Sequence, residues 1–107
     1  MDSNSAAACM ESLGNPTRLD IFRLLVRAGQ SGTPVGTIQN KLNIPASTLS
    51  HHVSHLVKNG LVSQIREGRS LKCSVNFAQM HQLLDFLTEE CCADESTQEC
   101  AAPKACC

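Results

Sequence analysis

Two segments with the apolar spacing of an α-helix are separated by a break of only three residues, 43–45. The first follows Pro34 and repeats apolar residues at i, i+3 and i+7. The second runs from about residue 46 to residue 59 and stops at Gly60, a residue type that favours helix C-termini. The apolar positions of both segments are Val35, Ile38, Leu42, Leu49, Val53, Leu56 and Val57. Two helices joined by so short a turn are typical of a helix-turn-helix motif.

The segments around this motif predict a mainly α fold with a small β-hairpin (α+β). Residues 1–8 are expected to be frayed, with a short helix over 6–13, and Asn15-Pro16 predicts the start of a further helix. Residues 61–65 and 70–75 have the pattern of two strands around a turn at 66–69. A last helix is predicted over 77–91, with the apolar stripe Phe77, Met80, Leu84 and Leu87.

The length of 107 residues suits one domain, which we place at 1–92 and follow with a flexible, Cys-rich tail at 93–107. No apolar run approaches the roughly 20 residues of a membrane span, and no signal-peptide pattern is present. These features predict a cytoplasmic protein with no membrane partner. Because thiols stay reduced in that compartment, the odd count of seven cysteines indicates metal binding or thiol chemistry rather than a disulfide framework.

The net charge of −1 hides a segregation of charge along the chain. Residues 16–72 carry +6, residues 1–15 carry −2, and residues 73–107 carry −5. A basic body with an acidic end can hold phosphate groups while the tail stays away from the duplex. Stacking on single-stranded bases is not expected, because the chain has three Phe and no Trp or Tyr. The sequence contains no Ser/His/Asp set, phosphate loop or paired carboxylates, so we predict neither an enzyme nor a catalytic cofactor.

Three motifs resemble the ArsR/SmtB family of winged-helix repressors over roughly residues 10–90. They are Asn15-Pro16-Thr17-Arg18-Leu19-Asp20-Ile21, Ser47-Thr48-Leu49-Ser50-His51-His52-Val53 and, in the hairpin or wing, Arg66-Glu67-Gly68-Arg69. The resemblance implies a winged helix-turn-helix homodimer that pairs through its first and last helices. It also implies that the dimer represses transcription from double-stranded operator DNA until a ligand binds.

Recognition helices of this kind place the side chains of their first turns at base edges in the major groove, and wings contact phosphates or the minor groove. The predicted DNA-binding residues are therefore Ser47, Thr48, Ser50, His51, Arg66 and Arg69. The spacing of His51 and His55, at i and i+4, would also suit zinc binding. No carboxylate or third ligand stands nearby, so we expect His51 to face DNA and His52 and His55 to be structural.

Five of the seven cysteines fall within the last 17 residues: Cys91, Cys92, Cys100, Cys106 and Cys107. Soft, thiol-seeking elements select sulfur ligands, and adjacent residues, with Cα atoms about 3.8 Å apart, can bring two thiols to one ion. The recognition helix lacks the Cys-Val-Cys pair of some family members, and the last helix has only His81 in place of the family's zinc ligands. Sensing is therefore expected in the tail.

Members of the family that resemble this chain around Glu90-Cys91-Cys92 respond to trivalent arsenic through such a pair and a third, downstream cysteine. The resemblance implies As(III) or Sb(III) as the inducer. The ligands that it implies are Cys91, Cys92 and Cys100, with Cys106 and Cys107 as accessories. Three sulfurs suit the pyramidal As(III) or Sb(III) centre, whereas zinc prefers four ligands.

Other interpretations of the cysteines stay open at this stage. The same scaffold could sense oxidants or reactive sulfur through a disulfide, or Hg(II) or Cd(II), and the protein could instead be a thiol-rich metal carrier that binds no DNA. The tail cysteines could also be passengers without a function. Nearby acids should disfavour thiolates, which argues against a peroxide sensor. Cys73 is expected to be a small buried hydrophobe, and Cys9 a spare thiol or a sulfur donor across the dimer interface.

Overall fold

The computed structural model describes residues 1–95, which form five helices and three strands. The helices are α1 (Ser3–Leu13), α2 (Pro16–Ala28), α3 (Val35–Leu42), α4 (Ala46–Lys58) and α5 (Phe77–Thr88). The strands are β1 (Thr33–Pro34), β2 (Val62–Glu67) and β3 (Ser70–Val75). The predicted α+β class, with a helix-turn-helix and a wing, is confirmed. None of the helices within residues 1–95 has the length and apolar character of a membrane span.

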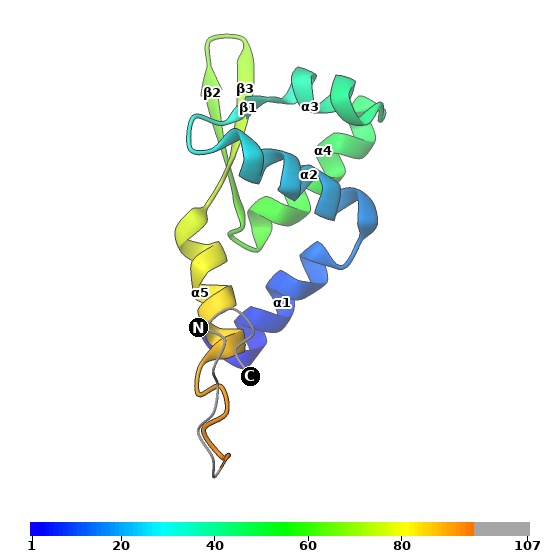
Figure 1. Cartoon of the computed structure of the whole chain (residues 1–107). Coiled ribbons are helices and arrows are strands. Elements are labelled where there is room, and N and C mark those ends of the chain that lie inside the picture. Colours follow the sequence, from blue (N-terminus) through cyan, green and yellow to red (C-terminus); the bar gives the residue numbers. More distant parts are fainter. Residues whose placement is uncertain (96–107) are drawn as a thin grey trace.

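The three strands form one antiparallel sheet in the order β1-β3-β2. The β2-β3 hairpin projects from the helical body as the wing, while α1 and α5 lie together at the opposite end (Figure 1). Strand β2 runs to Glu67, two residues beyond the predicted end, because Glu67 pairs with Ser70 across a tight turn. Gly68 has φ +61° in this turn, a conformation that side chains with a Cβ rarely adopt.

The helix boundaries follow local capping, and two predictions at the chain ends are wrong. Residues 1–8 are not frayed, because the Asp2 side chain accepts a hydrogen bond from the Ser5 amide at 2.8 Å and Ala6 is buried. Asn15 caps α2 as predicted, accepting from the Arg18 amide at 3.1 Å. Helix α5 ends at Thr88 and not near residue 91, so the cysteine pair lies outside it.

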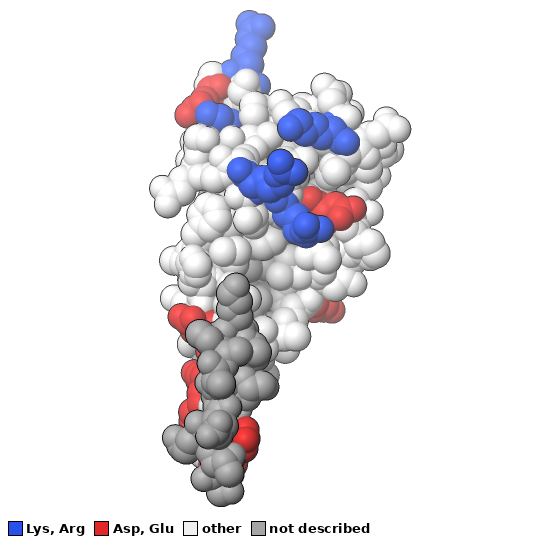
Figure 2. All heavy atoms as spheres, viewed as in Figure 1, with Lys and Arg blue, Asp and Glu red and all other residues white. Residues whose placement is uncertain are grey.

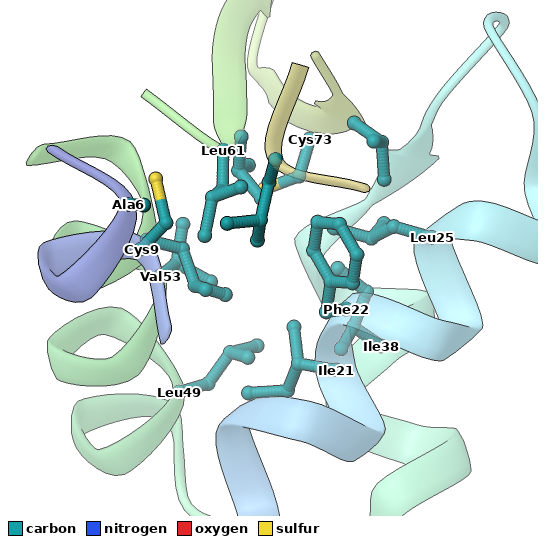
Figure 3. Close-up of a cluster of buried hydrophobic side chains, with 14 residues drawn as sticks. Ala6, Cys9, Ile21, Phe22, Leu25, Ile38, Leu49, Val53, Leu61 and Cys73 are labelled. Atoms are coloured by element: carbon teal, nitrogen blue, oxygen red, sulfur yellow. The ribbon is translucent and has the colours of Figure 1, made fainter. Parts of the chain in front are cut away.

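The hydrophobic core is built where α1, α2, α3 and α4 close over the inner face of the sheet (Figure 3). Ile21, Leu25, Ile38, Leu56 and Leu61 are fully shielded from solvent. The predicted inward positions of α4 at Leu49, Val53 and Leu56 are confirmed, whereas Val57 is 37% exposed. This core fixes α3 and α4 against the wing, so that the elements predicted to contact DNA form one rigid end of the molecule.

Candidate nucleic-acid interface

Helix α4 has a buried apolar side and an exposed polar side. Leu49 and Val53 face the core, while Ser47, Ser50 and His51 are exposed. Thr48, the fourth predicted base-reading residue, is half-buried. The chain is extended at Pro45, with φ −64° and ψ 150°, so α4 begins abruptly at Ala46. The exposed first turns therefore present short donor and acceptor side chains, the chemistry that base edges in a major groove require.

A polar network fastens the other side of α4 to α1. Ser12 is fully shielded from solvent, and its hydroxyl lies 2.7 Å from His55 Nδ1. The Asn59 side-chain amide, just after α4, donates to the same hydroxyl. Within residues 1–95 no buried side-chain nitrogen or oxygen lacks a hydrogen-bond partner. A satisfied network of this kind fixes the roll of α4 about its own axis, which decides the side chains that face outward.

Residues from α2 and α5 extend this network. Arg18 Nε donates to the Ser12 carbonyl oxygen at 2.7 Å, and an Arg18 guanidinium nitrogen lies 3.4 Å from His52 Nδ1. Gln79 Nε2 lies 3.4 Å from Cys9 Sγ and 3.5 Å from the Asn59 carbonyl oxygen. Burial, with the neighbouring Arg18 charge second, lowers the pKa of His52 below its ordinary value. His52 and His55 thus both contact side chains of other helices in the same chain, which supports the structural roles predicted for them.

Sequence reasoning did not identify Ser12, Asn59 or Gln79 as positioning residues. Ser12 follows Cys9 by three residues and Ala6 by six, so it lies on the buried side of α1. A polar residue at an apolar position of a helix indicates that its side chain is buried and has a hydrogen-bond partner. That signal is present in the sequence, but it does not identify the partner.

The wing contributes the cationic part of the interface. Arg66 and Arg69 are both exposed, as expected of phosphate or minor-groove contacts. Glu67, between them, forms an ion pair with Lys72 at 3.6 Å. Figure 2 shows Lys and Arg side chains on the wing and across α2 and α3, with most of the visible Asp and Glu side chains toward the end where α5 finishes. The charge segregation of the sequence thus becomes a separation in space.

The cysteine pair lies in a series of turns after α5. Cys91 is exposed, Cys92 is half-buried, and their Sγ atoms are 3.6 Å apart. Glu90 and Cys92 both have positive φ, at 58° and 61°. Cys100, Cys106 and Cys107 lie outside the described residues. Among residues 1–95 no group of three or more His, Cys, Asp or Glu side chains is arranged to hold a metal.

The other two cysteines are core residues. Cys73 is fully buried on the inner face of β3, as predicted, and burial raises the pKa of its thiol. Cys9 is 1% exposed and its sulfur lies 3.6 Å from the Asn59 carbonyl oxygen. Cys9 thus contacts its own subunit's network, which argues against a role as sulfur donor to a partner.

Comparison with known proteins agrees with this geometry. Residues 13–65 match a family model described as a helix-turn-helix domain. A helix-turn-helix-type transcriptional regulator of Methanocaldococcus jannaschii is 40% identical over 63 residues, which cover 59% of this chain and 68% of that protein. The transcriptional repressor BigR from Xylella fastidiosa has 25% identity and a TM-score of 0.66, over 90% of this chain and 91% of that one. An ArsR-like transcriptional regulator from Rhodococcus sp. RHA1 has 20% identity and a TM-score of 0.69, over 78% and 76% of the two chains.

A helix-turn-helix with an exposed polar recognition helix, followed by a basic wing, defines a winged-helix transcriptional regulator. Together with the matched relatives, these features show that the chain belongs to the ArsR/SmtB family. Its relatives are transcriptional regulators rather than enzymes. DNA binding follows from membership of this class.

Proposed function

We propose that this protein is an arsenite-responsive repressor. It binds operator DNA as a homodimer and releases it when As(III) or Sb(III) binds Cys91, Cys92 and Cys100. The DNA-binding half of the proposal follows from the family and from the polar face of α4. The inducer half rests on the cysteines after α5, and each half has its own test.

The separation of the paired sulfurs is the observation that carries the inducer assignment. Two sulfurs bound at about 2.3 Å to one soft centre stand less than about 4 Å apart when the angle between the bonds is tetrahedral or smaller, and the Sγ atoms of Cys91 and Cys92 are 3.6 Å apart. In the reduced form, the pair can therefore chelate one soft centre with a small rearrangement. Cys100 is five residues past Glu95, and so short a segment spans at most about 18 Å, which lets its sulfur return to the pair.

The dimer assignment rests on the exposed side of α5. Leu84 and Leu87 are 51% and 53% exposed and lie three residues apart on one face of this helix. Apolar residues concentrated on one helix of a small protein are typical of a surface that a second copy covers. A ligand bound just after α5 would act on the end of this surface. Allosteric coupling between two sites is typically about 1–3 kcal/mol, or 5–150-fold in affinity.

The direct test measures release of DNA by arsenite. A fluorescent duplex selected by the protein from a random pool is titrated with protein and then with sodium arsenite. The reductant is a phosphine, because dithiols would themselves bind arsenite. We expect Cys91→Ser, Cys92→Ser and Cys100→Ser to bind the duplex normally and to lose the release.

The matched control removes two thiols from the same tail. The Cys106→Ser/Cys107→Ser double variant should still release DNA, and so should a chain truncated at Pro103. Normal release by Cys100→Ser, together with no release by the truncated chain, would move the third ligand to the terminal pair. If the wild-type protein releases DNA with Cd(II) or Hg(II), but not with arsenite or Sb(III), the proposed inducer is contradicted.

A second candidate function is sensing of oxidants or reactive sulfur on the same scaffold. The observation that favours it is again the proximity of the Cys91 and Cys92 sulfurs, because a 3.6 Å separation lets an oxidant join them with a small rearrangement. Arsenite binding requires the reduced form, so the two functions use different states of the same residues. Mass spectrometry after peroxide or polysulfide treatment, paired with DNA-binding measurements, separates them. Release by these reagents at concentrations where arsenite has no effect would favour this candidate.

A further inference from the structure

A polar cleft of about 450 Å³ lies between α3 and the wing. Helix α3 lines it with Thr37 and Asn40, and the wing lines it with Arg66, Arg69 and Ser70. Two arginines line it, and among the described residues no Asp or Glu does. Its chemistry is therefore that of an anion site, on the part of the molecule that carries the recognition helix.

The strand register explains why the cleft is cationic although the wing also carries Glu67. Residues paired across antiparallel strands share a face, and faces alternate along each strand. Arg66 pairs with Leu71, which lies two residues from the buried Cys73, so Arg66 is on the face that turns toward the body. Glu67 lies on the opposite face, where it forms its ion pair with Lys72. The single acid of the wing is thus directed away from the cleft.

Helix α3 presents its two polar side chains from one side. Thr37 and Asn40 are three residues apart and therefore lie on the same face of the helix. Ile38 is fully buried and holds the helix to the core, while Thr37 is half-buried and Asn40 is exposed. The hydroxyl and the amide can both donate hydrogen bonds across the cleft toward a group that the arginines also reach.

We propose that this cleft binds one phosphate group of the DNA backbone, held between Thr37 and Asn40 of α3 and Arg66 of the wing. The inference rests on the proposed function in that it requires duplex DNA as the ligand. A phosphodiester carries one negative charge on two free oxygens, which suits one guanidinium and two neutral donors. Both arginines are exposed, so the cleft suits a phosphate presented by a long polymer along the surface.

A contact at this position would fix how the protein is placed on the duplex, and it would not depend on the base sequence. Helix α3 packs against both α4 and β3, so a phosphate fixed between α3 and the wing sets how far α4 enters the major groove. Phosphate contacts of this kind contribute equally to every duplex sequence. The cleft therefore predicts a loss of affinity that is the same for operator DNA and for unrelated DNA.

The test introduces a negative charge into the cleft and removes one donor. Asn40→Asp should weaken binding about tenfold or more to the selected duplex and to an unrelated duplex alike. Thr37→Ala should weaken both about 2–10-fold, as expected for one lost hydrogen bond. A plot of log K against log salt has a negative slope, and Arg66→Gln should make that slope less negative by about one unit. Asn4→Asp, the same substitution on exposed α1, is the matched control and should bind like wild type.

Thermal unfolding by circular dichroism accompanies each variant, and Thr37→Ala provides the answer if Asn40→Asp does not fold. Wild-type affinity in the folded Asn40→Asp and Thr37→Ala variants would overturn the proposal, as would a loss restricted to the selected duplex. So would saturation of the Thr37 and Asn40 amide chemical shifts by submillimolar inorganic phosphate at constant ionic strength, because the cleft would then bind a free anion. All measurements omit arsenite, so a failure of arsenite to release DNA contradicts only the proposed inducer.

Discussion

Helices α4 and α5 have almost the same length, 13 and 12 residues, but use their surfaces differently. Helix α4 buries three large apolar residues, Leu49, Val53 and Leu56, and exposes hydroxyl and imidazole groups. Helix α5 buries only Leu83 and exposes Leu84 and Leu87. The apolar side of α4 is therefore covered by its own subunit, and its polar groups point outward. Helix α5 instead leaves apolar surface that a second copy can cover.

The largest expected effect comes from breaking the buried side of α4. Leu56 is fully buried, so Leu56→Ala should lower the free energy of unfolding by about 2–5 kcal/mol through lost burial and the cavity that remains. Leu84→Ala makes the same chemical change at an exposed position and should cost less than about 1 kcal/mol under conditions that keep the protein monomeric. Urea unfolding of both variants checks the contrast. Equal destabilisation would mean that α5 is as integral to the subunit core as α4.

The next effect concerns the exposed side of α5. Leu84→Asp/Leu87→Asp places carboxylates on the surface that we assign to the dimer, and should weaken self-association at least about 100-fold. Sedimentation over a concentration series measures the change. Gln82→Asp adds a carboxylate to an exposed position of the same helix and is the control for charge. A double variant that associates like wild type would remove α5 from the interface.

These two helices also show what the sequence can predict. The inward positions Leu49, Val53 and Leu56 were predictable because helical spacing and an apolar side chain both point to burial. The end of α5 was predicted three residues too late, because Cys91 lies seven residues past Leu84 and continues the apolar spacing. Apolar spacing takes no account of charge. The carboxylates of Glu89 and Glu90 interact unfavourably with the negative end of the helix, and this interaction disfavours a further turn.

The exposed residues of the candidate interface were predictable from the sequence, whereas the buried network and the cleft were not. Short polar side chains at the start of a recognition helix and arginines in a wing follow from the motif itself, and the structure exposes Ser50 and Arg66 accordingly. The hydrogen bonds of Ser12 to His55 and Asn59 join residues more than 40 positions apart, so they depend on how the helices pack. The α3–wing cleft likewise depends on strand register.

The smallest expected effect tests the attachment of α4 through its histidines. Because the pKa of His52 is lowered in the folded protein, the unfolded chain binds more protons as pH falls below about 6.5. His52 therefore contributes a loss of stability as pH falls from neutral toward 5.5, and the loss ends below the folded-state pKa. His52→Gln should reduce this pH dependence, measured by urea unfolding at pH 7.5 and 5.5. Parallel curves for the two proteins would contradict the assignment.

The early end of α5 has a consequence for how this protein can change. Cys91 and Cys92 follow a turn rather than a helical register, with the Cys91 amide bonded to the Thr88 carbonyl oxygen at 3.1 Å. Residues could be inserted or deleted between Thr88 and the pair without rotating any side chain of α5 or α4. The segment after residue 88 can therefore change in length, or be joined to a related scaffold, while the exposed face of α4 and the wing stay unchanged.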